Sequence, residues 1–246
     1  MKFIDWFPYY QDIRRQFGYS TEKDQNAANQ LSKMIKKKSM SLKKLQKKIA
    51  GKDVLVIGAG PSLIENIDFI KKNRKYVKIA ANGAVEALIT NKIRPDIVVS
   101  DLDGDPTFLK KAEKLGAIMV VHAHGDNENA IEKLVPRFKN VIGSTQVMPI
   151  ENVYNFGGFT DGDRSVFMAD EMGARTIVLV GMDLTEQTTK YSAGKIANQD
   201  LKGKKLKRAK QLLEMLSKKS KCSLFNKSSN SIKGFSRLDI KYPKND

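Results

Sequence analysis

Three aspartates follow a short apolar run at alternate positions: Asp101, Asp103 and Asp105. The run, residues 96–99, is typical of a buried strand, and a strand puts every second side chain on one face. Asp101 and Asp103 should therefore project together from its end, whereas the turn that follows leaves the direction of Asp105 open. Carboxylates this close repel one another, and oxygen ligands at a strand end favour Mg²⁺ shared with substrate phosphates. The alternative is an Asp- and Gly-rich loop that caps the next helix.

The composition is that of a globular chain with one sizeable core. Its 246 residues are 41% hydrophobic and 29% charged, and no apolar run approaches the length that crosses a bilayer. The acidic Asp5 lies where a signal peptide would be basic or apolar. One cysteine cannot form an internal disulfide, and two histidines make a zinc site untenable. We therefore expect a cytoplasmic protein with no membrane partner.

A net charge of +17 raises the question of a nucleic-acid partner. The lysines concentrate in residues 33–48 and 202–221, which have helical patterns, and such runs are typical of a solvated helix face. No zinc finger, basic-region heptad or aromatic RNA-binding motif accompanies them. The sequence therefore predicts no specific nucleic-acid binding. The positive charge would help to attract an anionic substrate such as ATP.

Apolar runs alternate with helical segments from residue 53 onward, and the runs fall at 53–57, 77–80, 96–99, 117–121, 140–142 and 176–180. This alternation predicts an α/β fold, a Rossmann-like and mostly parallel sheet with helices on both faces. The expected organisation is an N-terminal helical segment (1–50), a catalytic core (51–187), and a C-terminal lid loop, helix and tail packed on the core (188–246). The aromatic residues near the N-terminus would pack on the core or on a second subunit of a homo-oligomer.

Polar residues gather where the predicted strands end, whereas the loops at the opposite ends are basic and ordinary. The turn 58–62 follows the first strand, and its glycines would let backbone N–H groups approach an anion. Ser62 would be a helix N-cap or a phosphate contact. Later strand ends carry further polar groups, and another cluster precedes a predicted helix: Asn82 and Gly83; His122, His124, Asp126 and Asn127; Ser144 and Thr145; Thr160, Asp161 and Asp163. The carboxyl ends of parallel strands share one edge, which is where we expect the active site.

Taken in order, these motifs resemble those of the archaeal 6-hydroxymethyl-7,8-dihydropterin pyrophosphokinase family, over about residues 50–235. That family is similar to the thiamine pyrophosphokinases, whose Gly-Asp-Phe-Asp-Ser resembles residues 100–104. The resemblance implies transfer of a diphosphoryl group from ATP to the hydroxymethyl oxygen of a reduced pterin. AMP would be the other product, and the pathway would be folate or tetrahydromethanopterin biosynthesis.

The resemblance also suggests roles for the residues at the sheet edge. The catalytic residues would be Asp101, Asp103 and Asp161, and Mg²⁺ would bind Asp101, Asp103 and Asp105. Nucleotide contacts would come from Gly58, Gly60, Ser62, Asn82, Gly83, Ser144 and Thr145. Pterin contacts would come from His122, His124, Asp126, Asn127, Thr160 and Asp163. Whether Asp161 and Asp163 hold metal or substrate stays open, as does whether each histidine meets phosphate or only supports a loop.

Other functions remain compatible with these residues. An Asp-x-Asp after a strand also serves metal-dependent transfer from nucleotide sugars, so a glycosyltransferase is one alternative. A thiamine pyrophosphokinase-like enzyme and a non-catalytic nucleotide-binding module are others. Residues 188–195 combine lysines, hydroxyls and glycine, and would form either a lid or a solvent loop.

Overall fold

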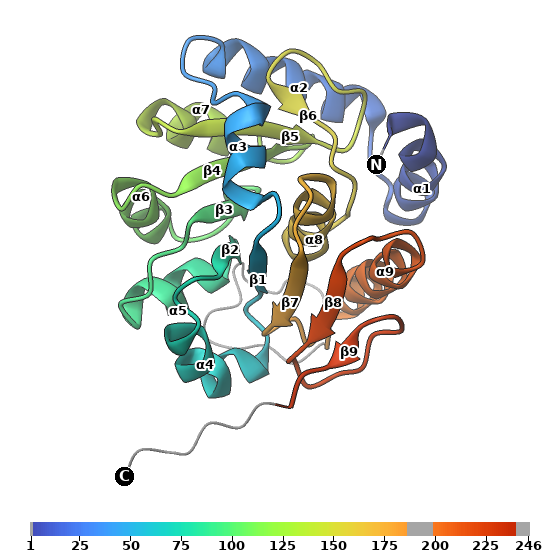
Figure 1. Cartoon of the computed structure of the whole chain (residues 1–246). Coiled ribbons are helices and arrows are strands. Elements are labelled where there is room, and N and C mark those ends of the chain that lie inside the picture. The colour runs from blue at the N-terminus through green and yellow to red at the C-terminus, as the bar shows by residue number, and fades with distance from the viewer. Residues whose placement is uncertain (1, 186–198, 240–246) are drawn as a thin grey trace.

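Strand β1 (Asp53–Ile57) lies inside the sheet, between β2 and β7, and organises the chain around it (Figure 1). The structure is a computed structural model that describes residues 2–185 and 199–239. Within these residues one nine-stranded sheet has the order β6-β5-β4-β3-β2-β1-β7-β8-β9, and every neighbouring pair is parallel. The α/β parallel-sheet fold expected from the sequence is confirmed.

The other strands are β2 (Val77–Ala81), β3 (Ile97–Ser100), β4 (Ile118–Ala123), β5 (Val141–Thr145), β6 (Val153–Tyr154), β7 (Thr176–Val180), β8 (Ser223–Asn226) and β9 (Ser236–Arg237). All residues of β2, β3, β4 and β5 are buried, as expected for parallel strands covered on both faces. The two-residue β6 was missed in the sequence because so short a strand has no recognisable pattern.

The helices are α1 (Phe3–Phe17), α2 (Thr21–Ile35), α3 (Leu42–Ile49), α4 (Ile67–Lys72), α5 (Ala84–Thr90), α6 (Pro106–Lys114), α7 (Glu128–Leu134), α8 (Asp161–Glu171) and α9 (Gln199–Ser217), with short 3₁₀ helices η1 (Pro61–Asn66) and η2 (Val135–Arg137). Figure 1 shows α4, α5 and α6 on one side of the sheet and α8 and α9 on the other. No helix in the described part of the chain is both long and apolar enough to cross a membrane.

The chain moves outward from β1 to β6 and then returns to β7 on the other side of β1. The carboxyl ends of β1 and β7 therefore flank a topological switch point, where open parallel sheets bind ligands. The sheet continues through β8 and β9, so the C-terminal segment adds two strands to the core. The predicted lid, residues 188–195, lies outside the described residues.

The N-terminal helices belong to the same hydrophobic core as the sheet. In α1 the buried residues are Trp6, Tyr10 and Ile13, whereas Phe7, expected to share the packed face, is 39% exposed. The Trp6 indole lies edge-on to Phe167 of α8 and donates a hydrogen bond to the Gln146 carbonyl oxygen at 2.9 Å. Trp6 and Tyr10 thus pack on the core of the same chain, and a homo-oligomer stays a prediction.

Because Trp6 joins α1 to the main core, Trp6→Ala should lower the free energy of unfolding by about 3–5 kcal/mol. The whole protein should still unfold in one transition, measured by chemical denaturation followed by circular dichroism. Ile4→Ala is the matched control, since Ile4 lies in the same helix and is 78% exposed. A separate early transition of α1 that leaves the main transition unchanged would show that the N-terminal helices are a separate unit.

Candidate active site

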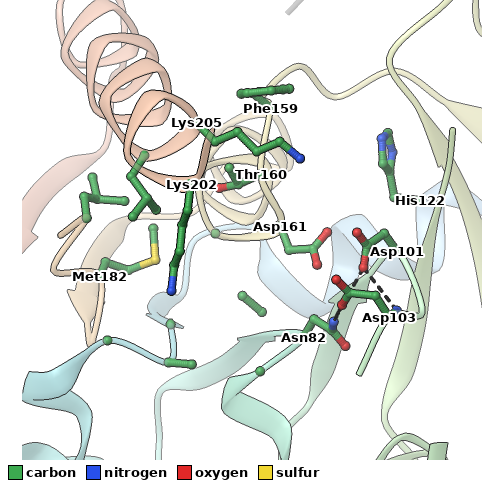
Figure 2. Close-up of a pocket in the computed structure, with 18 of the residues that line it drawn as sticks. Asn82, Asp101, Asp103, His122, Phe159, Thr160, Asp161, Met182, Lys202 and Lys205 are labelled. Carbon is green, nitrogen blue, oxygen red and sulfur yellow. Dashed lines mark hydrogen bonds between the residues drawn. The ribbon is translucent and has the colours of Figure 1, made fainter. Parts of the chain in front are cut away.

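A cavity of about 340 Å³ opens at the carboxyl ends of the central strands, on both sides of the switch point. Its walls come from the turns after β1, β2, β3, β4 and β7, the start of α8, and the first turns of α9. Asp101, Asp103 and Asp161 line it together, as Figure 2 shows. The structure thus brings Asp161 beside the two aspartates that follow β3, although 57 or more residues separate them in sequence.

The pairing of Asp101 and Asp103 comes from a tight turn and not from strand alternation, because β3 already ends at Ser100. Leu102, between them, has a positive φ of 70° and a buried side chain. A leucine in this left-handed conformation is strained, and such strain persists where surrounding contacts hold it. The Ser100 hydroxyl accepts a hydrogen bond from the Leu102 amide at 2.8 Å and donates one to the Asn82 side chain at 2.8 Å.

The Asn82 side chain also bridges the two carboxylates. Its amide nitrogen donates to Asp103 and reaches Oδ1 of Asp101 at 3.5 Å. Gly104 must approach closely here, since a Cβ at that position would lie 2.4 Å from the Asn82 oxygen. Asn82, predicted as a nucleotide contact, therefore lines the cavity and also fixes the acidic turn.

The carboxylates affect one another's ionisation. Desolvation and the neighbouring charge of Asp101 raise the pKa of Asp103 to about 7, while His124 and Lys205 oppose the shift. Desolvation, and then the charges of Asp101 and Asp103, raise the pKa of Asp161 well above its usual value. Desolvation acts on Asp101 too, but hydrogen bonds from His124 and Asp103 outweigh it and keep that pKa low. Asp101 thus loses its proton readily, whereas Asp103 and Asp161 are shifted toward their protonated forms.

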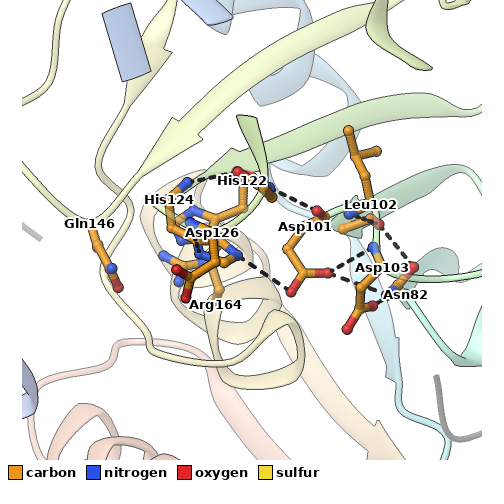
Figure 3. A network of polar contacts seen from close by, with 12 residues as sticks. Asn82, Asp101, Leu102, Asp103, His122, His124, Asp126, Gln146 and Arg164 are labelled. Carbon is orange, nitrogen blue, oxygen red and sulfur yellow. Dashed lines mark hydrogen bonds and ion pairs between the residues drawn. The ribbon is translucent and has the colours of Figure 1, made fainter. Parts of the chain in front are cut away.

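The two histidines line the cavity in different surroundings (Figure 3). His124 places Nε2 at 3.7 Å from the Asp101 carboxylate, and its Nδ1 accepts a hydrogen bond from the Asp126 amide at 3.3 Å. This assigns the ring proton of neutral His124 to Nε2, facing Asp101. The His122 ring is buried and stacks on His124 with centroids 5.8 Å apart. Burial and the positive charge of Arg164 hold the pKa of His122 well below its usual value, so it is neutral.

Arg164 is a fully buried cation that the sequence analysis did not single out. Its guanidinium donates to the carbonyl oxygens of Gly157 and Phe159, each at 3.2 Å, which holds the loop that leads into α8. Gly158 (φ 80°) lets that loop pass, since a Cβ there would lie 2.5 Å from the Arg164 Cα. Burial lowers the pKa of the Arg164 guanidinium, and the charges of Asp161, Asp163 and Asp101 oppose this shift. Arg164 thus offsets part of the negative charge on the cavity wall.

Eleven of the predicted site residues line the cavity: Gly58, Gly60, Asn82, Gly83, Asp101, Asp103, His122, His124, Asp126, Thr160 and Asp161. Six others lie outside its lining, and each has a structural role that explains its position: Ser62, Asp105, Asn127, Ser144, Thr145 and Asp163. Their predicted contacts with metal, nucleotide or pterin stay predictions.

Asp105 and Asp163 are helix caps. The Asp105 carboxylate accepts the Thr107 amide at 2.7 Å at the start of α6, which fits the capping alternative, and its predicted metal contact stays a prediction. Asp163 is fully buried and accepts the amides of Phe159 and Thr160, each at 2.7 Å, in the capping box of α8. Its carboxylate shapes the loop before Asp161 instead of meeting substrate.

The side chains that follow β4 and β5 are mainly supports. Ser144 and Thr145 are completely buried and lie outside the cavity lining, and the Ser144 hydroxyl lies 3.5 Å from Nδ1 of His122. Asn127 donates to the carbonyl oxygens of Asp101 and His122, each at 2.7 Å. It therefore ties the acidic turn to the end of β4 and positions the site without lining it.

Ser62 is not the predicted N-cap. The turn after β1 leads into the 3₁₀ helix η1, with Gly60 at the cap position and Ser62 inside the helix. The Ser62 amide donates to the Asp183 carboxylate at 2.9 Å. An acidic side chain from the end of β7 thus already occupies the turn that was expected to receive phosphate.

Several lining residues were not predicted: Tyr19, Gln146, Phe159, Asp183, Lys202 and Lys205. Gln146 follows the predicted strand end 143–145, and Asp183 follows the last predicted strand, so their positions were available signals. Lys202 and Lys205 were assigned to a solvated helix face, because periodicity alone does not show which part of a lysine-rich helix covers a cavity. Buried Asp24 of α2 accepts hydrogen bonds from the Gly125 amide and the Gln146 side chain, each at 2.8 Å, and so fixes this end of the cavity.

The chemistry of the wall fits a hard divalent cation. The donors are carboxylate oxygens, and their mutual repulsion, seen in the raised pKa values of Asp103 and Asp161, would be relieved by bound positive charge. Across residues 2–185 and 199–239, no three acidic, histidine or cysteine side chains already form a metal cage. An incomplete set of this kind suits Mg²⁺, which retains waters and shares substrate phosphates.

Fold and site together define a doubly wound α/β protein with an acidic cavity at the switch point of its sheet. A family model described as 6-hydroxymethylpterin diphosphokinase MptE-like matches residues 25–189. The chain belongs to this family.

Curated relatives cover most of the chain. Proteins named 6-hydroxymethyl-7,8-dihydropterin pyrophosphokinase are 40% identical over 234 residues in Methanocaldococcus jannaschii and 44% identical over 224 residues in Pyrococcus furiosus. These matches include 89% and 88% of this chain, and 97% and 94% of the relatives. A protein of the same name in Methanothermobacter thermautotrophicus is 40% identical over 76% of this chain and 81% of its own length.

A solved structure supports the fold alone. The MAf glycosyltransferase from Magnetospirillum magneticum AMB-1 superposes with a TM-score of 0.56 at 17% identity. The match covers 87% of this chain and 38% of the glycosyltransferase chain.

The raised pKa of Asp103 has a consequence for stability without metal. Its folded-state pKa of about 7 exceeds the ordinary value of 3.8, so the native state binds this proton more tightly than the unfolded state. Stability should therefore fall as pH rises between these values. Because Asp103 is exposed to the cavity, the slope should stay below the roughly 1.4 kcal/mol per pH unit of a fully desolvated group.

Thermal unfolding in chelator, measured from pH 5 to pH 8, should show Asp103→Asn gaining stability relative to the native protein as pH rises. Added Mg²⁺ should reduce this difference. If the difference between the two proteins were independent of pH, Asp103 would have an ordinary pKa in the folded protein.

Proposed function

We propose that this protein transfers a diphosphoryl group from ATP to the hydroxymethyl oxygen of 6-hydroxymethyl-7,8-dihydropterin, with Mg²⁺, and releases AMP. The observation that carries the proposal is the grouping of Asp101, Asp103 and Asp161 in one cavity of a chain from the MptE-like family. The archaeal relatives named for this activity match nearly their full length, which supports the same reaction here.

The reaction needs positioning and charge compensation more than a strong base. An oxygen nucleophile must attack the β-phosphorus in line, against several negative charges. Bound Mg²⁺ would supply charge neutralisation at the phosphate oxygens. Asp101, the carboxylate with the lowered pKa, and Asp103 and Asp161 beside it would hold the ion. Asn82, Asn127 and His124 keep the Asp101 turn in place.

The end of the cavity beside β4 and β5 suits the pterin. Phe159 and Tyr19 line it with ring centroids 6.2 Å apart, and such rings can pack against a flat heterocycle. Gln146 and Asp126 line the same region and offer amide and carboxylate groups for the polar edge of a pterin. The Gln146 amide is held by Asp24, so one of its hydrogen-bonding positions is fixed before a ligand binds.

The proposal includes the compartment and pathway in which the enzyme acts. We propose a cytoplasmic enzyme in folate or tetrahydromethanopterin biosynthesis, with ATP and a reduced pterin as its ligands. The single cysteine, Cys222, is unpaired, which suits a reducing compartment. Any binding of nucleic acid to the basic surface should be independent of base sequence and weaken steeply with salt.

The products identify the reaction. With MgATP and 6-hydroxymethyl-7,8-dihydropterin, AMP and pterin diphosphate should form in equal amounts, measured by chromatography of both. Asp101→Asn should reduce the rate by about 100-fold or more, because it weakens binding of the Mg²⁺ that would offset the phosphate charge in the transition state. Glu132→Gln is a control of matched chemistry, since that residue lies on α7, outside the cavity lining.

ADP as the stoichiometric product would indicate attack at the γ-phosphorus and contradict the proposal. Transfer from a nucleotide sugar with ATP left intact would instead support the glycosyltransferase alternative. Diphosphorylation of thiamine in preference to the pterin would leave the reaction type standing and change the acceptor.

A further inference from the structure

We infer that the cavity divides ATP between two regions: the turn after β1 receives the nucleoside, and Lys202 and Lys205 of α9 hold the phosphates beside the carboxylates. A glycine turn at the first strand would ordinarily be assigned to phosphate. Here the buried Asp183 and the two lysines reverse that assignment. The inference rests on the proposed use of ATP and adds the orientation of the nucleotide and the residues that determine it.

Asp183 fills the anion position of the turn after β1. Its side chain is 1% exposed. One carboxylate oxygen accepts the Ser62 amide at 2.9 Å, and the other accepts the Ser229 amide at 2.7 Å. A Cβ on Gly60 would lie 2.3 Å from the Asp183 oxygen, so the glycine is there to admit this carboxylate. A phosphate at the same place would compete for the Ser62 amide and be repelled by the charge.

The same carboxylate suits a nucleoside. Asp183 lines the cavity, and its oxygens have acceptor positions beyond the two amides. Ribose hydroxyls donate hydrogen bonds, and a carboxylate at the edge of a Rossmann-like sheet commonly accepts them. Ala59, Met182 and Leu184 line the same region and provide apolar surface for a flat base.

The cations lie on α9. Figure 2 shows Lys202 and Lys205 reaching into the cavity that Asp101, Asp103 and Asp161 line. Within residues 2–185 and 199–239, neither lysine takes part in a salt bridge. The Lys205 amine lies 5.8 Å above the centre of the Tyr19 ring, which places it toward the proposed pterin end. Amines that face carboxylates across a cavity without pairing with them can both contact an intervening phosphate chain.

This assignment orders the parts of the cavity as the reaction orders its groups: nucleoside, phosphates and then pterin. In this assignment the β1 and β7 turns would hold the nucleoside, the carboxylates and lysines would flank the phosphates, and Tyr19 and Phe159 would face the acceptor. This arrangement would place the β-phosphate, which the hydroxymethyl oxygen attacks as AMP leaves, toward the pterin. Lys205 would contact the diphosphoryl group that is transferred, and Lys202 the part of the phosphate chain closer to ribose.

The test is calorimetric titration of the full chain, in MgCl₂, with α,β-methylene-ATP and with AMP. Lys205→Met should weaken the ATP analogue about tenfold or more while changing AMP affinity about twofold or less. Lys202→Met should weaken the ATP analogue to a similar degree. Lys218→Met removes the same charge from an exposed position just after α9 and should leave both affinities unchanged.

Asp183→Asn separates the two assignments of the glycine turn by the sign of its effect. If the turn holds the nucleoside, the ATP analogue and AMP should weaken by the same factor. If it holds phosphate, removal of the negative charge should strengthen the ATP analogue, which would overturn the inference. The lysine variants decide the matter independently if the Asp183 variant fails to fold.

The wild-type titration distinguishes failure of the inference from failure of the proposed function. Binding of the ATP analogue by the wild type with no difference between Lys205→Met, Lys202→Met and Lys218→Met would overturn the inference alone. No binding of the analogue by the wild-type protein would contradict the use of ATP, and both proposals would fall.

Discussion

The crowding of three carboxylates on one cavity wall is the constraint on which the rest of the site depends. Without a cation, Asp103 and Asp161 are held toward their protonated forms by desolvation and by their neighbours' charges. Other groups make this arrangement tolerable: Arg164 is buried behind it, His124 faces Asp101, and Asn82 donates to the acidic turn. The left-handed backbone of Leu102, between Asp101 and Asp103, adds conformational strain to the same turn. A fold maintains such a grouping when function requires it.

The topology of the sheet explains how one small cavity can contain opposite charges. Strands β2 to β6 extend the sheet on one side of β1 and strands β7 to β9 extend it on the other, so turns from both halves of the sheet meet at the cavity. The start of α8 contributes Asp161 to the cavity, and the first turns of α9 contribute Lys202 and Lys205. The N-terminal helices close the β4 end, where Asp24 holds Gln146 and Gly125. Carboxylates, amines and aromatic rings therefore follow one another along the cavity.

The sequence was sufficient to predict the parallel sheet and the acidic wall. Buried strands such as 53–57 and 176–180 are continuous apolar runs, and their ends meet at one edge by geometry alone. The roles of individual polar side chains were harder to predict, since Asp105, Asp163 and Ser144 have the same chemistry whether they cap, support or bind. The distinction depends on direction and burial, which tertiary packing sets. Arg164 was missed because nothing in its local sequence marks a buried cation.

The most direct test of the central claim is the binding of Mn²⁺, in place of Mg²⁺, measured by electron paramagnetic resonance in the presence of α,β-methylene-ATP. The acidic wall predicts tight binding by the wild type and a loss of about tenfold or more in Asp101→Asn and Asp161→Asn. Asp105→Asn should bind normally, because that carboxylate caps α6 outside the cavity. Equal Mn²⁺ affinity in all four proteins would contradict the account.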